Sequence, residues 1–180
     1  PSFDLAQIED GDEATGRLLS AGATIGCFQI ESAGMQSTCR QLQVKDTPGL
    51  IAAISLHRPA PLRGGLKSAF VRRFVGQETV EYYHPALQPI LAETLGVILY
   101  QEQVLRLAHE VAGLSLELAD TLRRSMTRFR SVDEMAAMRD AFMRGAWTTS
   151  GIPGKTADRI WTQMQAFAGY GFPKAHAAGY

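Results

Sequence analysis

Apolar residues recur at helical spacing through the second half of the chain, and this periodicity constrains the fold more than any other feature. Four stripes follow one another, and each repeats at intervals of three or four residues, as the buried face of a helix does. Their members are Tyr100, Val104, Leu107, Ala108 and Val111; Leu118, Leu122, Met126 and Phe129; Met135, Met138, Phe142 and Ala146; and Ala157, Ile160, Trp161, Met164, Phe167 and Ala168. We therefore predict a mainly α chain in which these stripes form the core. One or two short β elements are expected near the N-terminal half, at Thr24–Ile30 and Gly96–Tyr100.

Helix boundaries can be predicted from a few residues that favour helix ends. Thr47 is predicted to be the N-cap of a helix, because Pro48 follows it and proline is favoured at the first helical position. Gly113 and Gly151 stand where helices should end, because glycine readily adopts the left-handed conformation that closes a helix.

The overall composition excludes little, because 18 basic residues balance 18 acidic ones. Evidence for an anionic partner must therefore come from where the charges lie along the chain. The two cysteines are too few and too far apart for a metal-binding knuckle, which favours a reduced, cytoplasmic protein. A secretory signal and an apolar run long enough to span a membrane are both missing from the sequence, so no membrane partner is expected.

An arginine-rich stretch follows the second stripe. Arg123, Arg124, Arg128 and Arg130 occur together, and on a helix Asp120, Arg124 and Arg128 would lie in one row. One carboxylate cannot neutralise four guanidinium groups, and arginine is well suited to bidentate contact with phosphate. The stretch is either a solvated helix face with one intrahelical ion pair, between Asp120 and Arg124, or a site for a phosphate or nucleic acid.

A second basic cluster comprises Arg63, Lys67, Arg72 and Arg73. It is typical either of a charged amphipathic helix or of a surface that contacts the DNA backbone.

The chain closes with aromatic, cationic and imidazole groups on alternate positions: Tyr170, Phe172, Lys174 and His176. The aromatic rings could stack on a sugar or base, and the two basic groups could contact phosphate. Pro173 could begin a helix whose first amides also favour an anion. The alternative is a glycine-rich turn with a core phenylalanine and a hydrogen-bonded histidine.

Five stretches in the same order carry a resemblance to a known family: GCFQIESAGM (26–35), LHRPAPLRGG (56–65), LGVILYQEQVLRLA (95–108), GLSLELADTLRRSM (113–126) and FAGYGFPKAHAAGY (167–180). Together they resemble the alpha subunit of bacterial DNA polymerase III, a C-family replicative polymerase. The resemblance implies a multi-helix fingers-type domain at 46–180, preceded by a palm-to-fingers junction at 1–45, in a fragment truncated at both ends. It implies nucleotidyl transfer in DNA replication, with DNA template-primer, dNTP and other replicase subunits as partners.

The resemblance also assigns residues. The paired arginines of the LRR motif fall on Arg123 and Arg124, which would contact the triphosphate. The tyrosine of the YGF motif falls on Tyr170, against the dNTP sugar, and Lys174 and His176 would lie near the phosphates. We expect DNA contacts from the basic residues Arg63, Lys67, Arg72, Arg73 and Arg128. Catalytic residues and metal ligands are not expected in this chain, because the aspartates that hold Mg²⁺ in the full-length enzyme belong to palm motifs expected before Pro1; the fragment alone is expected to be inactive.

Several departures from the family pattern leave alternatives open. Ala60 stands where the family usually has glycine, and Thr127 and Phe129 stand in a stretch that often reads A-M-G-K-K. The error-prone paralogue of translesion synthesis shares most of these motifs. A non-catalytic helical nucleic-acid-binding module, or a helical interaction domain with a solvated arginine face, would also fit the residues taken alone.

Overall fold

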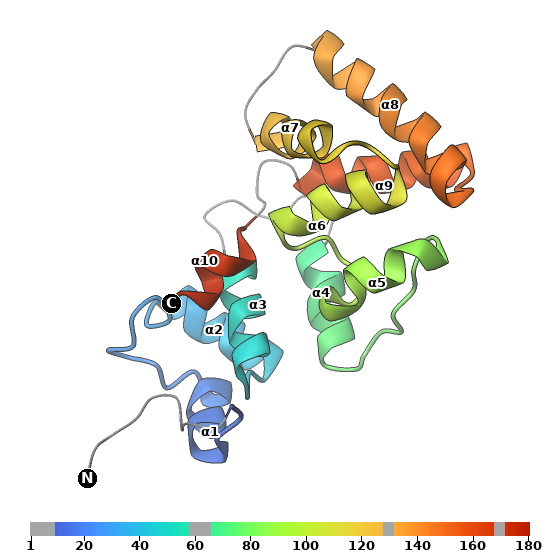
Figure 1. The fold of residues 1–180 in the computed structure, drawn as a ribbon. Helices are drawn as coiled ribbons and strands as arrows, with labels where there is room; N and C mark the ends of the chain where they lie inside the picture. The colour runs from blue at the N-terminus through green and yellow to red at the C-terminus, as the bar shows by residue number, and fades with distance from the viewer. Residues whose placement is uncertain (1–9, 58–65, 128–131, 168–171) are drawn as a thin grey trace. The chain divides into compact units, whose positions relative to one another are not determined.

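The chain is mainly helical, as the apolar periodicity predicts (Figure 1). The computed structural model describes residues 10–57, 66–127, 132–167 and 172–180. Within these ranges the predicted β elements are not formed: the extended pairing consists of one isolated parallel bridge between Tyr100 and Phe172. The run Gly96–Tyr100 therefore contributes a bridge at its last residue instead of a strand.

The second predicted extended run, Thr24–Ile30, forms consecutive turns. Gly26 and Gln29 both have positive φ angles, of 80° and 66°, which bend the backbone away from an extended path. The buried hydroxyl of Thr24 donates to the carbonyl oxygen of Ile30 at 2.5 Å and closes the loop. Thr24 and Ile30 are β-branched, which is typical of a strand, but here they are hydrogen-bonded to each other across a series of turns.

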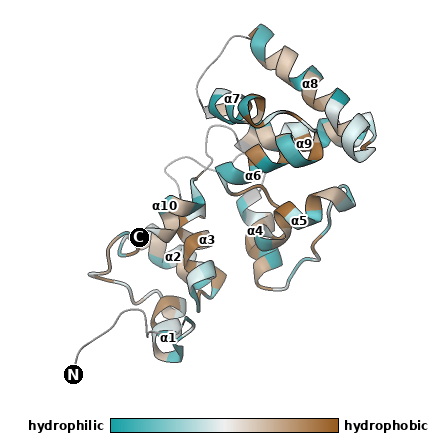
Figure 2. Cartoon of the chain, viewed as in Figure 1, coloured by the Kyte–Doolittle hydropathy of each residue, from teal (hydrophilic) through white to brown (hydrophobic). Residues whose placement is uncertain are grey.

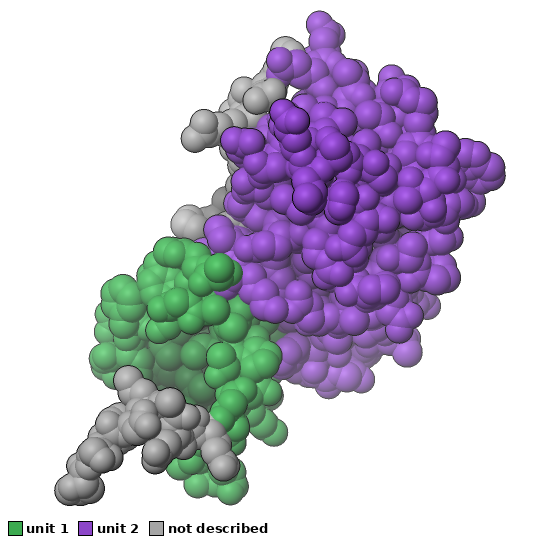
Figure 3. All heavy atoms as spheres, in the orientation of Figure 1, with its two compact units in different colours: residues 1–57, 175–180 green, residues 58–174 purple. Residues whose placement is uncertain are grey.

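The described helices belong to two compact units, which are coloured separately in Figure 3. Unit 1 comprises Pro1–His57 with Ala175–Tyr180, and unit 2 comprises Arg58–Lys174. The predicted assignment of 1–45 to a palm junction and of 46–180 to the fingers stays a prediction.

Among its described residues, unit 1 contains three complete helices, and short polar side chains cap their N-termini. They are α1 (Glu13–Ala21), α2 (Ala33–Leu42) and α3 (Thr47–Leu56). Asp12, Ser32 and Asp46 each accept a hydrogen bond from the backbone amide three residues later, at 2.7, 3.3 and 2.8 Å. The cap of α3 is thus Asp46 and not Thr47, because the carboxylate reaches the Gly49 amide while Thr47 has already entered the helix.

Unit 2 contains the remaining elements. They are α4 (Leu66–Phe74), η3 (Pro85–Leu87), α5 (Gln88–Leu91), η4 (Ala92–Thr94), α6 (Gln101–Arg106), η5 (Leu107–Val111), α7 (Leu116–Thr127), α8 (Val132–Ser150), α9 (Gly154–Phe167) and the start of α10 (Lys174–Ala178). Figure 2 shows that helices such as α7 and α9 carry both hydrophilic and hydrophobic residues along their length.

The core of unit 2 is formed by the predicted stripes. All members of the first stripe are buried, and so are Phe142 and Ala146 of the third and Ala157, Ile160, Trp161 and Met164 of the fourth. The second stripe is rotated relative to the prediction: Leu118 is 36% exposed, while Ala119 is fully buried beside Leu122. Phe129 and Ala168 lie outside the described residues. The rings of Phe142 and Trp161 pack with their centroids 5.6 Å apart at the centre of this core.

A single π-helical turn, η5, continues α6. Its closing bond runs from the Ala112 amide to the Leu107 carbonyl oxygen at 3.2 Å, five residues back. Gly113 follows with a φ of 63°, and Gly151 ends α8 with a φ of 66°, so both predicted stops are confirmed.

Candidate functional site

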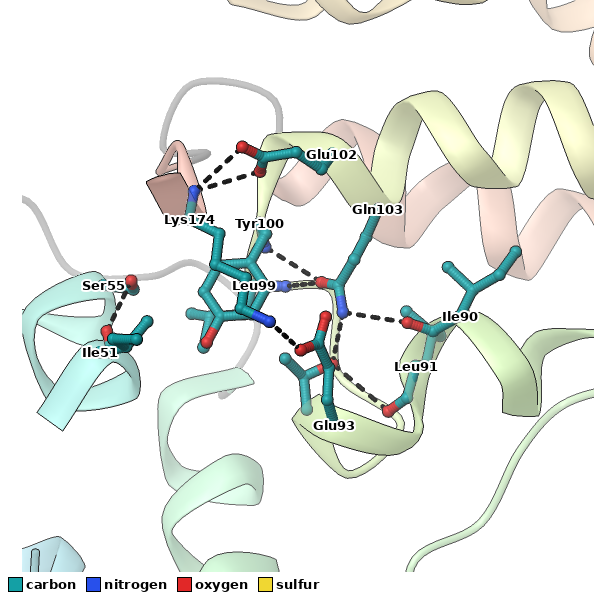
Figure 4. A network of polar contacts seen from close by, with 11 residues as sticks. Ile51, Ser55, Ile90, Leu91, Glu93, Leu99, Tyr100, Glu102, Gln103 and Lys174 are labelled. Carbon is teal, nitrogen blue, oxygen red and sulfur yellow. Dashed lines mark hydrogen bonds and ion pairs between the residues drawn. The ribbon is translucent and has the colours of Figure 1, made fainter. Parts of the chain in front are cut away.

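Gln103 fixes the start of α6 through four hydrogen bonds (Figure 4). Its side-chain oxygen accepts from the amides of Leu99 and Tyr100 at 2.8 and 3.0 Å. Its side-chain nitrogen donates to the Ile90 carbonyl oxygen at 3.2 Å and to the Thr94 hydroxyl at 2.7 Å. Gln103 is 2% exposed, so these bonds form away from water, where leaving a polar group unpaired is costly. The network holds the Tyr100–Gln103 segment in one position.

Lys174 lies against this segment and meets two carboxylates. Its ammonium group forms an ion pair with Glu93 and lies 5.5 Å from the ring centroid of Tyr100 (Figure 4). Its backbone amide donates to both carboxylate oxygens of Glu102, at 3.1 and 3.2 Å. The predicted helix at Pro173 is confirmed as α10, but the anion that its first amide binds is a carboxylate of this chain.

Tyr100 presents an uncharged ring to Lys174. Burial raises the pKa of its phenol far above the ordinary value, and the nearby carboxylates of Glu93 and Glu102 raise it further. The phenol therefore remains protonated, which excludes it as a general base and leaves the face of the ring as its contribution.

The backbone also joins the end of the chain to α6. The amide of Gln101 donates to the Phe172 carbonyl oxygen at 3.1 Å, beside the bridge between Tyr100 and Phe172. These contacts join residues about 70 positions apart and place Lys174 at the first turn of α6.

Arg123 reaches the same turn from α7. Its guanidinium donates through Nε and Nη2 to Asp120 at 2.9 and 2.8 Å, and through Nη1 to the side-chain oxygen of Gln101 at 2.8 Å. Arg124 pairs with the other carboxylate oxygen of Asp120 at 2.6 Å, and its side chain is 61% exposed. The hydrogen bond from Arg123 is the main cause that lowers the pKa of Asp120, with the charge of Arg124 adding to it. The sequence predicted a pair between Asp120 and Arg124, and the structure adds Arg123 to it.

The structure thus brings two predicted site residues to neighbouring positions. Arg123 contacts Gln101, and Lys174 contacts Glu102, the next residue in the chain. His176 belongs to unit 1, where its Nε2 shares a hydrogen bond of 2.8 Å with the Tyr180 hydroxyl. Three further predicted site residues lie outside the described residues: Arg63, Arg128 and Tyr170.

The second basic cluster is partly engaged inside unit 2. Arg72 and Arg73 both donate to Glu78, at 2.8 and 2.9 Å, and these hydrogen bonds lower the pKa of that carboxyl. Arg73 also donates to the Leu95 carbonyl oxygen at 2.9 Å, and only 16% of its side chain is exposed. Arg72 is more accessible, and Lys67 is half-buried on the same helix, α4. Arg73 therefore ties α4 to the residue after η4, while Arg72 keeps more of its side chain in water.

The described part of the chain offers no obvious metal centre. In residues 10–57, 66–127, 132–167 and 172–180, no three His, Cys, Asp or Glu side chains are grouped so as to hold an ion. The carboxylates that contact the candidate residues are already paired: Glu93 and Glu102 bind Lys174, and Asp120 binds Arg123 and Arg124. These residues do not fit a magnesium ion, and the prediction that its ligands lie elsewhere in a longer enzyme stays a prediction. Among the same described ranges, no helix is both long and apolar enough to cross a membrane.

The sequence analysis missed the residues that organise this site: Glu93, Gln101, Glu102 and Gln103. The available signal was the QEQ tripeptide directly after the buried run Val97–Tyr100. Three polar residues that follow four buried ones mark a position where a core element meets polar partners.

Comparison with known proteins decides the family. A family model described as the bacterial DNA polymerase III alpha subunit finger domain matches residues 1–150. The chain belongs to this family. Four of the five stretches lie within the matched residues, and the family that they resemble is thereby confirmed.

Two kinds of relative align with almost the whole chain. The DNA polymerase III subunit alpha of Pasteurella multocida is 43% identical over 185 residues, covering 100% of the chain and 16% of that protein. The corresponding subunit of Thermus aquaticus is 45% identical over 183 residues, covering 99% and 15%. The error-prone DNA polymerase of Corynebacterium glutamicum is 40% identical over 178 residues, covering 99% and 16%. The chain spans roughly a sixth of the length of these relatives, so it corresponds to one part of a much longer polypeptide.

Proposed function

We propose that this chain is the fingers part of a DNA-directed DNA polymerase and binds the triphosphate of the incoming dNTP during DNA replication. The observation that carries the proposal is the convergence of Arg123 and Lys174 on adjacent residues of α6. A triphosphate needs several fixed cations, and prepositioned charges lower the barrier of phosphoryl transfer because they need not reorganise during the reaction. Tyr170 and His176 complete the proposed dNTP contacts, as the family resemblance implies.

The geometry of Arg123 suits this role. Its bonds to Asp120 and Gln101 use three of the five guanidinium N–H groups, which leaves two for a phosphate. The same bonds fix the orientation of the guanidinium plane, so binding a phosphate would cost little side-chain entropy. Arg124, which shares Asp120 and is more exposed, supplies a second cation on the same helix.

The decisive experiment changes Arg123 in the full-length polymerase. Arg123→Ala should raise the KM for dNTP by about ten- to a hundredfold, because a charge-assisted hydrogen bond contributes about 1.5 to 3 kcal/mol. The dissociation constant for primer-template should stay within twofold. Arg123→Lys should show a similar loss, since an ammonium group cannot keep the three bonds to Asp120 and Gln101 while it also binds phosphate.

Arg139→Ala is a matched control, because Arg139 also pairs with a carboxylate, that of Asp158 at 2.6 Å, on the surface of unit 2. It should leave both constants unchanged. An equal loss of dNTP and primer-template binding in Arg123→Ala would argue against a triphosphate role and favour a general nucleic-acid-binding surface.

We also propose that the basic residues of α4, together with Arg63 and Arg128, contact the DNA backbone. Lys67 and Arg72 are the described residues best placed to do so, since Arg73 is largely engaged by Glu78 and Leu95. Lys67→Ala should weaken primer-template binding at low salt and reduce the slope of log K against log salt by about 0.9. An unchanged slope would remove Lys67 from the DNA contacts.

The full-length enzyme is proposed to act in the bacterial cytoplasm, with DNA template-primer and other replicase subunits as partners and Mg²⁺ as its cofactor. The magnesium ligands are assigned to parts of the polypeptide outside this chain. A role in translesion synthesis is a second candidate, favoured by the 40% identity to an error-prone DNA polymerase. Primer extension past an abasic site, measured with the full-length protein, distinguishes the two roles.

A further inference from the structure

The ion pair between Lys174 and Glu93 lies at the surface of unit 2. Both side chains are 43% exposed, so water reaches the charged groups. An exposed pair of this kind contributes little to stability, and each partner can exchange it for another charged group at small cost. The ammonium group of Lys174 is a compact charge on a flexible side chain, and its three N–H donors can rotate toward a new acceptor.

We propose that Glu93 is a positioning residue that competes with the dNTP triphosphate for the ammonium group of Lys174. The inference rests on the proposed function, in which Lys174 contacts the phosphates. The triphosphate as a whole carries more negative charge than one carboxylate and accepts strong charge-assisted hydrogen bonds, so it displaces Glu93. The carboxylate sets how readily this cation is released to a nucleotide.

The two carboxylates around Lys174 have different roles. Glu102 holds the backbone amide of Lys174 through both oxygens, and this contact can persist when the side chain moves. The ring of Tyr100, buried beside the ammonium group, supplies a fixed surface over which the side chain can swing between partners. Glu93 pairs with the charged end of the side chain, so this ion pair is the contact that a phosphate would replace.

The test uses Glu93→Gln in the full-length polymerase, bound to primer-template with a terminated primer and at constant magnesium. The dissociation constant for dNTP should fall about two- to fivefold, which corresponds to the loss of an exposed ion pair of about 1 kcal/mol or less. Glu110→Gln is the matched control: Glu110 pairs with Arg106 at 2.7 Å, and its side chain is also 43% exposed. It removes the same charge from unit 2 without touching Lys174, and the dissociation constant should not change.

Lys174→Ala completes the cycle. It should weaken dNTP binding. Adding Glu93→Gln to this variant should bring no further change, because the ammonium group for which Glu93 and the triphosphate compete is then absent. A tightening by Glu93→Gln that persists without Lys174 would mean general charge repulsion and would overturn the inference.

The remaining outcomes separate the inference from the function on which it rests. If Lys174→Ala weakens dNTP binding but Glu93→Gln leaves it unchanged or weaker, Glu93 does not compete and only the inference fails. If Lys174→Ala leaves dNTP binding unchanged, Lys174 is not a phosphate contact, and its place in the proposed function fails together with the inference.

Discussion

Replacing Gln103 with methionine should remove one of the strongest polar constraints in unit 2 while keeping the volume of the side chain. The backbone amides of Leu99 and Tyr100 would lose their acceptor, and both residues are almost fully buried. Each buried donor left without a partner costs about 1 to 3 kcal/mol. We take the lower half of that range for each of the two amides, and a smaller cost for the Ile90 carbonyl oxygen and the Thr94 hydroxyl, which lose their donor. The free energy of unfolding should then fall by about 3 kcal/mol.

Urea unfolding followed by tryptophan fluorescence measures this loss. Trp161 is 1% exposed and packs against Phe142 in the core of unit 2, so its emission reports the unit that contains Gln103. With a slope of about 2 kcal/mol per molar urea, the midpoint should fall by about 1.5 M. Gln165→Met, at an exposed position of α9, should shift it by no more than about 0.3 M. Equal midpoints for the two variants would refute the view that the four bonds of Gln103 stabilise the start of α6.

Two further predictions concern packing and pH. Gly145→Ala should destabilise the chain by about 2 kcal/mol, because a Cβ at this position would overlap the carbonyl oxygen of Ala112. A Cβ at Gly154 would lie in open space, so Gly154→Ala should be neutral or should stabilise the chain by up to about 1 kcal/mol. Thermal unfolding compares the two, and equal effects would contradict the close packing at Gly145. The pKa of Asp120 is lowered in the folded state, chiefly by the hydrogen bond from Arg123. The ionised carboxylate therefore contributes its full stabilisation at pH values above the ordinary pKa of 3.8, and this stabilisation is lost as the pH falls through the lowered pKa of the folded state. The difference in unfolding free energy between the wild type and Asp120→Asn should therefore vanish in strong acid, and a difference independent of pH would exclude an ionic role.

The helical framework was predictable because burial depends on spacing along one helix. The buried residues of the first stripe and the glycine stops required no knowledge of distant partners. The error at Thr24–Ile30 has a physical cause: β-branched residues favour strands, but the positive φ angles of Gly26 and Gln29 turn the chain back on itself. The shift of the helix cap from Thr47 to Asp46 is a one-residue error, the usual size for a helix boundary.

The candidate site was predictable only in part, because its contacts join residues far apart in the sequence. The arginines of α7 stood out as an unbalanced cluster, and Asp120 was near enough to be recognised as a partner. Lys174 and Glu93 are 81 positions apart, and neither residue indicates the other. Gln101 and Gln103 are polar residues within a helical stripe, and a periodicity argument passes over them because it counts only apolar positions.

The π-helical turn η5 allows one segment to change in length without turning its neighbours. It places one more residue between Gln101 and Gly113 than a regular α-helix of the same extent would hold. Deleting a single residue there would close the bulge and leave a regular α-helix, so Gln101 and Glu102 would still face Arg123 and Lys174. A second deletion would have no bulge to absorb it and would rotate the first turn by about 100° relative to the last. In a related polymerase, a one-residue gap at this turn would therefore predict that the proposed phosphate contacts are kept, whereas a two-residue gap would predict that they are rebuilt.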